Sequence, residues 1–270
     1  MTTRTSVDGR PDGMLSPHDR GVLYGDALFE TMLFVGGSAP LWPRHLTRLA
    51  DGCARLRLPL PDLAALAAEC AARSDGIARA VVRVTVTRGV GERGYAPPRE
   101  PRPTLIVTAA PAPVVSPSWY ADGVRLYECE TRYATPSALA GIKHANRLEQ
   151  VIARAEWDDA DFAEGLMCDA HGRAISATSA NLFARIDGML ATPSVERCGV
   201  AGVARAQVLS GGDVVVRDIG IEELRSADEV FLTSSLRGIV PVAAIGATTY
   251  AIGTTTRSLQ AQWRAQGWMI

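Results

Sequence analysis

Apolar and polar residues alternate along several stretches of the chain, and this alternation predicts β-strands. In the clearest case, which starts at Ala78, the apolar positions are Ala80, Val82, Val84 and Val86. A second run, Leu28–Val35, ends at two glycines that would fold the chain back as a hairpin. Further strands are expected at 104–109, 124–130, 165–168, 174–177 and 229–235.

Other stretches carry apolar residues three or four positions apart, which is typical of helices. Pro43 begins one such stretch, in which Leu46, Leu49, Cys53 and Leu56 form the apolar stripe. Another stretch carries the stripe Leu148, Val151, Ile152 and Ala155, and further helices are expected at 61–73 and 254–266. Both strands and helices are therefore expected along the chain.

The length of 270 residues exceeds that of one typical domain, so two domains or one large domain are expected. The stretch PAPVVSPSW has the proline and serine density of a linker. We therefore expect a smaller N-terminal α/β domain at 1–112, a linker at 113–120 and a larger C-terminal domain at 121–270.

The chain has 28 basic and 29 acidic residues, so its charge indicates neither a nucleic acid nor an anionic membrane as partner. A small-molecule substrate is expected instead. The start of the sequence lacks the apolar core of a signal peptide, and no run is long enough to span a bilayer, which favours a cytoplasmic location. The five cysteines show no CxxC spacing and the four histidines are scattered, so no metal site is expected.

A lone lysine, Lys143, lies where a loop meets the apolar helix. An amine at such a position is partly desolvated, which favours its neutral form and suits it to act as a nucleophile or base. The alternative is a solvated surface lysine. The segment itself does not decide between them.

Four segments together resemble the fold-type-IV family of pyridoxal-phosphate (PLP) enzymes, from about Arg20 to Pro241. They are DRGVLYGDALFET, TRGVGERGY, GIKHANRLEQVIARAE and the series NLF, TP and GVAGVAR. The lysine segment is most similar to the aminodeoxychorismate lyase branch of this family. The resemblance implies a two-domain α/β (α+β) fold like that of D-amino acid aminotransferases, PLP between the domains, and a homodimer.

The resemblance also implies which residues bind the cofactor. Lys143 would hold it covalently, and Arg48 would bind its phosphate, since a guanidinium fork suits a phosphate dianion. A helix that opens within Gly199–Ala204 would offer backbone N–H groups to the same phosphate. The implied cofactor residues are Arg48, Lys143, Ser176, Val203, Ala204 and Ser235, with Thr233 as a second choice at the strand end. For Arg48 and Ser235 the alternatives are a solvated helix arginine and a simple turn serine.

Three further residues are candidates for binding the substrate. Arg88 and Arg93 lie in the glycine-rich segment, which overlies the active site in the family, and Asn146 follows the lysine. The two arginines would bind substrate carboxylates. Ordinary loop arginines are the alternative.

Ser176 departs from the family pattern. Most fold-type-IV enzymes carry a glutamate there, five positions before the asparagine of NLF, and it contacts the pyridine nitrogen. A hydroxyl offers only a neutral hydrogen bond, so electron withdrawal should be weaker, which favours elimination over transamination. The expected reaction converts 4-amino-4-deoxychorismate into 4-aminobenzoate and pyruvate, a step toward folate. A branched-chain or D-amino acid aminotransferase, and a PLP-binding protein without catalysis, are the alternatives.

Overall fold

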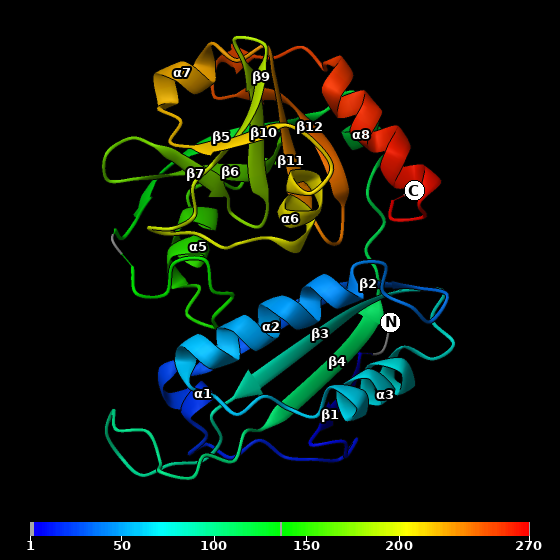
Figure 1. Ribbon diagram of the computed structural model, residues 1–270, viewed down its shortest axis with the longest axis vertical. Coiled ribbons are helices and arrows are strands. Elements are labelled where there is room, and N and C mark those ends of the chain that lie inside the picture. The colour runs from blue at the N-terminus through cyan, green and yellow to red at the C-terminus, as the bar shows by residue number, and fades with distance from the viewer. Residues whose placement is uncertain (1–2, 136, 270) are drawn as a thin grey trace. The chain divides into compact units, whose positions relative to one another are not determined.

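The computed structural model describes residues 3–135 and 137–269, and its chain divides into two compact units (Figure 1). Unit 1 runs to Pro113 and also includes Ile142–Asn146, whereas unit 2 consists of Val114–Gly141 and the chain from Arg147 onward. The division at Pro113 lies next to the sequence-based boundary at 112. Two differences stand out: the expected linker already belongs to unit 2, and five residues around Lys143 return to unit 1.

Unit 1 contains a four-stranded antiparallel sheet with the strand order β1-β4-β3-β2. Helix α2 packs on β2, and α3 packs on β3 and β4. The elements are β1 (Arg4–Val7), α1 (Arg20–Tyr24), β2 (Ala27–Val35), α2 (Trp42–Leu56), α3 (Leu63–Ser74), β3 (Arg79–Thr87) and β4 (Leu105–Pro111).

The alternation predicted for β3 is confirmed. Its apolar positions from Ala80 to Val86 have no exposed surface. Each of them pairs with a residue of β2 on the same face, so that Glu30 lies opposite Val84 in an otherwise apolar row. The turn at Gly36 is also present, but the strand that pairs with β2 is β3 and not the segment directly after the turn.

Helix α2 begins within one residue of the predicted start and has Pro43 in its first turn. Its buried side differs from the predicted stripe: His45 and Gly52 are buried, whereas Leu46 and Leu56 are only half-buried. The reason is the close approach of β2, because a Cβ on Gly52 would lie 3.0 Å from Leu28 Cδ1. A pattern that scores only apolar residues does not include glycine or histidine.

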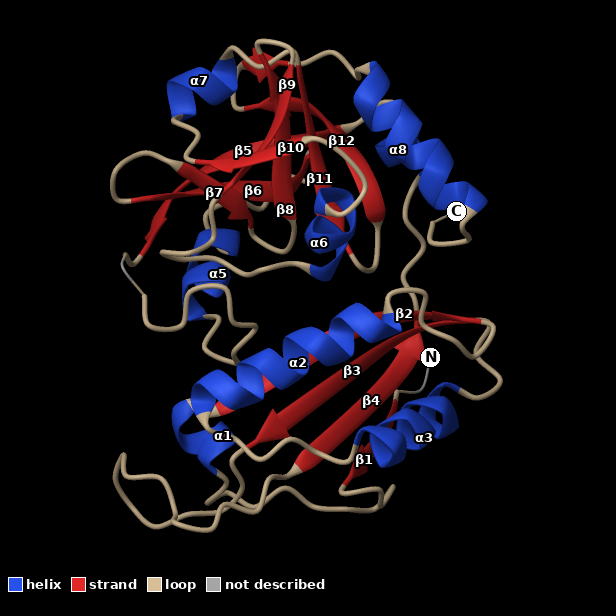
Figure 2. Cartoon of the chain, viewed as in Figure 1, coloured by secondary structure: helices blue, strands red, loops and turns tan. Residues whose placement is uncertain are grey.

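Unit 2 contains a nine-stranded sheet in which β8, β11, β12, β5, β6 and β7 close into a ring, because β7 also pairs with β8 (Figure 2). Phe183 and Phe231, a buried pair on two neighbouring strands of this sheet, stack at 5.1 Å between ring centroids. The strands are β5 (Val124–Tyr133), β6 (Phe162–Asp169), β7 (Ala174–Ala177), β8 (Asn181–Ile186), β9 (Met189–Pro193), β10 (Val214–Arg217), β11 (Glu229–Ser234), β12 (Gly238–Ile245) and β13 (Thr248–Thr249). The helices are α4 (Pro117–Ala121), α5 (Leu148–Arg154), α6 (Val203–Leu209), α7 (Ile221–Arg225) and α8 (Thr254–Ala265).

The apolar stripe expected on the helix after Lys143 is present on α5, but it is exposed. Leu148, Val151 and Ile152 keep 68%, 59% and 53% of their surface accessible. The short helix instead buries Ala153 against β5 and β6. Among the described residues, no helix is both long enough and apolar enough to cross a membrane.

Candidate active site

Lys143 is held against the edge strand of unit 1. The backbone N–H of Phe29 in β2 donates to the Lys143 carbonyl at 3.0 Å, and Ala145 N–H donates to Ala27 O at 2.9 Å. The lysine segment therefore extends the sheet by one short antiparallel bridge. Lys143 is half-buried, and its Nζ lies 4.3 Å from the centre of the Phe29 ring.

The chain just before Lys143 is fixed within unit 2. Gly141 donates its N–H to Gly199 O at 3.0 Å and accepts from Ala201 N–H at the same distance. Gly141 has a φ of +77°, a conformation that favours glycine. Backbone bonds on both sides of Lys143 therefore restrict where its side chain can reach.

Arg48 on α2 reaches the buried carboxylate of Glu30 on β2. Its Nε donates to Oε1 at 2.8 Å, its Nη2 pairs with Oε2, and His45 Nδ1 lies 2.6 Å from Oε2. Burial alone would raise the pKa of Glu30, but the charge and hydrogen bonds of Arg48 and His45 lower it to about 2. The carboxylate is thus ionised and fixes the orientation of the Arg48 guanidinium.

The start of α6 has the features of an anion-binding site. Gly202 is its N-cap residue and makes no side-chain cap, so the first N–H groups of the helix, including those of Val203 and Ala204, are not capped by a side chain. A Cβ on Gly202 would lie 1.9 Å from Asn181 Oδ1, so only glycine fits there. Asn181 in turn donates to Val200 O at 2.9 Å and pins the loop that leads into the helix.

A buried hydroxyl lies on the same sheet face as Asn181. Thr233 in β11 pairs directly with Asn181 of β8, and cross-strand pairs project from the same side of a sheet. Its Oγ1 has no hydrogen-bond partner among the described residues, although Thr233 is only 1% exposed. A buried polar atom normally has a partner, so this hydroxyl indicates a ligand near the start of α6. Ser235, the first choice from the sequence, is half-buried just after β11.

These features fit the phosphate of PLP. The first turn of α6 offers N–H donors, Thr233 offers a hydroxyl donor, and the glycine before the helix leaves the backbone accessible. Arg48 belongs to unit 1, and its role at the phosphate stays a prediction from the sequence. The described residues thus include the hydrogen-bond donors that a phosphate dianion requires.

Ser176 lies in β7, is only 5% exposed and stands opposite Asn181 of β8. Its Oγ donates to Ala177 O at 2.9 Å and lies 2.9 Å from the hydroxyl of Tyr133. Because the serine proton is used by Ala177, Tyr133 donates to Ser176, and one lone pair of Oγ remains to accept a further bond. Burial raises the pKa of Tyr133, so this phenol stays neutral. Sequence motifs did not point to Tyr133, because its contact arises only in the folded sheet.

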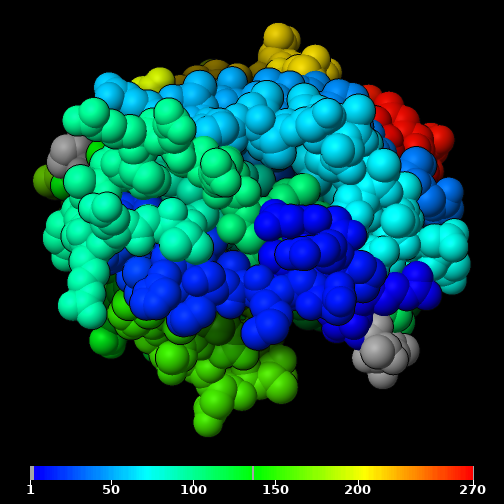
Figure 3. All heavy atoms as spheres, turned by 90° about the horizontal axis from the view of Figure 1, so that it is seen from below, coloured from blue at the N-terminus to red at the C-terminus, as the bar shows by residue number. Residues whose placement is uncertain are grey.

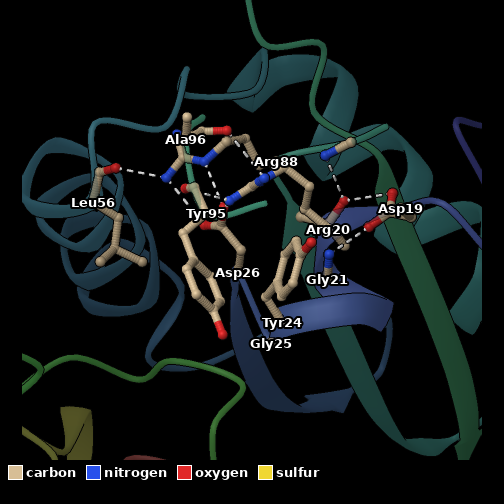
Figure 4. A network of polar contacts seen from close by, with 12 residues as sticks. Asp19, Arg20, Gly21, Tyr24, Gly25, Asp26, Leu56, Arg88, Tyr95 and Ala96 are labelled. Atoms are coloured by element: carbon tan, nitrogen blue, oxygen red, sulfur yellow. Dashed lines mark hydrogen bonds and ion pairs between the residues drawn. The ribbon is translucent and has the colours of Figure 1, made fainter. Parts of the chain in front are cut away.

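The three substrate-binding candidates differ in their surroundings. Arg88 is 7% exposed and forms a bidentate ion pair with Asp26, at 2.7 and 3.0 Å (Figure 4). Arg93 is exposed, and the described residues give it neither a hydrogen bond nor an ion pair. Asn146 is also exposed and donates to Gly25 O at 2.9 Å. Of the two arginines, Arg93 has its guanidinium available for a ligand, whereas that of Arg88 is held by Asp26.

Comparisons with known proteins point to one family. The sequence profile described as amino-transferase class IV matches residues 27–245. The aminodeoxychorismate lyase of Vibrio harveyi is 35% identical over 94% of this chain and 97% of its own length. A putative branched-chain-amino-acid aminotransferase of Methanocaldococcus jannaschii is 30% identical over 86% of this chain and 82% of its own.

The crystal structure of 4-amino-4-deoxychorismate lyase from Pseudomonas aeruginosa superposes with a TM-score of 0.92. It is 48% identical, and the match covers 97% of this chain and 98% of that chain. The fold class and the family resemblance predicted from the sequence are thereby confirmed. This protein belongs to the class IV aminotransferase family, the fold-type-IV PLP enzymes.

Proposed function

We propose that this protein is an aminodeoxychorismate lyase that converts 4-amino-4-deoxychorismate into 4-aminobenzoate and pyruvate. The observation that carries the proposal is the match to the Pseudomonas aeruginosa lyase, at 48% identity over nearly the whole of both chains. The Methanocaldococcus jannaschii aminotransferase, at 30% identity, is less similar to this chain than the Vibrio harveyi lyase, at 35%. The reaction would be a step toward folate.

The cofactor is PLP, which supplies an aldehyde that condenses with amines and a ring that withdraws electrons from the adjacent carbon. Lys143 is the only lysine in the sequence and would therefore be its covalent partner. Arg48, the N–H groups of Val203 and Ala204, and the hydroxyls at the end of β11 would hold the phosphate. Ser176 would face the ring nitrogen.

Lys143 is also the base in this proposal. Its amine takes the proton from the ring carbon that carries the substrate amino group, and the bond from the neighbouring carbon to the enolpyruvyl oxygen then breaks. The ring gains its third double bond and becomes aromatic, while enolpyruvate takes up a proton and becomes pyruvate. The backbone bonds on both sides of Lys143 hold the main chain from which its side chain extends.

The surroundings of Ser176 support a lyase over an aminotransferase. Its own proton is donated to Ala177 O, and it accepts from Tyr133, so it can offer the ring nitrogen only a neutral acceptor. A carboxylate at this position would stabilise a protonated ring far more strongly. Transamination depends more on that stabilisation than elimination does, because the electrons of an elimination leave with the departing group.

We also propose that the protein is a homodimer. The exposed apolar face of α5, formed by Leu148, Val151 and Ile152, supports this, because an apolar stripe on a helix is usually covered. The two units of the chain would be the two domains expected from the sequence. The cytoplasmic location stays a prediction.

The test is an assay of the purified, PLP-loaded protein with aminodeoxychorismate. We expect pyruvate, measured with lactate dehydrogenase and NADH, and an equal amount of 4-aminobenzoate, without any added 2-oxo acid. Lys143→Gln should abolish both products. Borohydride should fix one PLP per wild-type chain and none in the variant, because no other lysine is present. Transfer of amino groups from branched-chain or D-amino acids to 2-oxoglutarate, with no pyruvate formed, would overturn the proposal.

A further inference from the structure

The loop between β3 and β4, residues 88–104, contains Arg93 and has no helix or strand of its own. Its middle part, residues 92–97, is exposed throughout. Figure 3 shows this blue-green loop on the surface of unit 1, beside the blue N-terminal segment. A loop of this length needs contacts from elsewhere to keep one conformation.

Arg20 supplies those contacts at the tip of the loop. Its guanidinium donates to three successive carbonyls, Gly94 O at 3.0 Å, Tyr95 O at 3.0 Å and Ala96 O at 3.2 Å (Figure 4). Arg20 is only 4% exposed. The three acceptors directly follow Arg93, so the bonds of Arg20 fix the backbone on which Arg93 is carried.

Tyr24, one helical turn after Arg20 in α1, supports the same tip. Its hydroxyl accepts from Gly94 N–H at 3.2 Å, and its ring lies 5.5 Å from the ring of Tyr95. The Cζ atom of the Arg20 guanidinium lies over the Tyr24 ring, 4.8 Å from its centroid. The tip is therefore held by one helix.

Asp26 joins the tip of the loop to its base. The carboxylate of Asp26 accepts a hydrogen bond from Arg20 Nε at 3.0 Å. Both of its oxygens also accept from Arg88 at the start of the loop. Arg88 also donates to Leu56 O and Arg57 O at the end of α2. Burial raises the pKa of Asp26, but the bonds and charge of Arg88 and Arg20 outweigh this and lower it. The carboxylate thus stays ionised between its two arginines.

We infer that Arg20 is a positioning residue for substrate binding, which together with Asp26 presents Arg93 to a carboxylate of the substrate. The inference rests on the proposed function, whose substrate carries two carboxylates. Arg93 suits this role because its guanidinium is exposed and has no ion pair among the described residues. The guanidinium of Arg20 is already bonded to Asp26 and to three carbonyls of the loop, so Arg20 acts through Arg93 and does not touch the substrate.

Arg20→Lys tests the inference, because lysine keeps the charge but cannot reach three carbonyls with a planar fork. The KM for aminodeoxychorismate should rise about tenfold, while kcat and PLP affinity stay within about twofold of wild type. In an Arg93→Gln background, Arg20→Lys should raise KM no further, because the residue that it positions is gone. Trypsin should cut after Arg93 faster in Arg20→Lys than in wild type.

Arg217→Lys is the matched control, since Arg217 also forms a bidentate pair with a carboxylate, Glu223, and bonds a carbonyl, but lies in unit 2. It should leave KM unchanged. If Arg20→Lys does not fold, Tyr24→Phe removes one bond of the same tip and should raise KM in the same direction by a smaller factor. An unchanged KM in these variants, or effects of Arg20→Lys and Arg93→Gln that multiply, would overturn the inference. Wild-type protein that forms no pyruvate would instead overturn the proposed function.

Discussion

Lysine occurs once in this chain, and the other basic side chains among its 28 are arginines. A guanidinium stays protonated and cannot act as an amine nucleophile, so amine chemistry by a side chain is confined to Lys143. The planar guanidinium of arginine can bind both oxygens of a carboxylate, as Arg48 does with Glu30 and Arg88 does with Asp26. Covalent reactivity and anion recognition are thus divided between two residue types.

Residues of the candidate site could be predicted from the sequence only where they belong to a recognisable motif. Lys143 and Arg48 stood in recognisable segments, but the partner that orients Arg48 is Glu30 on another element. Tyr133 gave no local signal, because its hydrogen bond exists only in the folded sheet. Thr233 was named only as second choice after Ser235, because its buried hydroxyl without a partner is also a property of the folded sheet. Contacts between residues far apart in sequence set these environments.

Glu30 should make the stability of the protein depend on pH in the acidic range. Its pKa is about 2 in the folded chain against an ordinary value of 4.5, so its contribution is complete above pH 4.5 and is lost as pH falls toward 2. The full contribution is about 3 kcal/mol, of which about 2 kcal/mol should be lost by pH 3. Glu30→Gln cannot titrate, so urea unfolding at pH 6 and pH 3 should show a smaller loss for it.

The control is Glu222→Gln, because the side chain of Glu222 is 79% exposed and its ion pair with Arg225 lies on the surface. It should lose as much stability as wild type between the two pH values. Equal losses in all three proteins would mean that the carboxylate of Glu30 is not held in its ionised form by Arg48 and His45.

At the scale of elements, long and regular stretches were predictable, and short ones only where a turn set them apart, as for β7 (Ala174–Ala177) after the turn at Gly172. The patterns placed β3, α2, α3 and α8 within about two residues of their observed ends, because each spans enough residues to show a period. Elements of four or five residues, such as β1, α1 and α7, carry too few positions for a period. The exposed stripe of α5 shows a further limit: periodicity identifies an apolar face but not what covers it.

Gly202→Ala should weaken PLP binding through the start of α6. The added Cβ would lie 1.9 Å from Asn181 Oδ1, so Asn181 or the helix start must move, and the N–H groups of Val203 and Ala204 move with it. We expect PLP affinity to fall on the order of tenfold, as for one charge-assisted hydrogen bond. Titration of the apo protein with PLP, followed by absorbance, measures it.

Gly212→Ala serves as the comparison, because a Cβ at Gly212 meets no atom within 4 Å. That variant should bind PLP as wild type does. If Gly202→Ala binds PLP equally well, the start of α6 does not hold the phosphate.

At the scale of the whole molecule, the course of the chain around Lys143 was beyond sequence patterns. A single boundary near Pro113 was visible as a change in composition, but the return of Ile142–Asn146 to unit 1 was not. That return depends on pairing between residues as distant as Leu28 and His144. Such pairing is a property of the folded sheet, and the local composition of the sequence does not predict it.

The proposed dimer makes the exposed face of α5 the place where two chains meet. Covering Leu148, Val151 and Ile152 in both copies would remove six apolar side chains from water, each worth roughly 1.5–3 kcal/mol when fully buried. Val151→Glu would place a charge in that contact twice, since a two-fold interface uses the same patch on both chains. Wild type should therefore have twice the chain mass of 28.7 kDa in solution, and Val151→Glu should be a monomer.

Val216→Glu is the control for a charge added to an exposed valine, because Val216 is 47% exposed on β10, away from α5 in sequence. It should remain a dimer. Light scattering at micromolar concentration separates the outcomes, and activity assayed on the same samples shows whether dissociation also lowers pyruvate formation. A wild-type monomer, or a Val151→Glu variant that remains a dimer, would show that the face of α5 is not the contact, because two buried glutamates without partners could not be accommodated there at little cost.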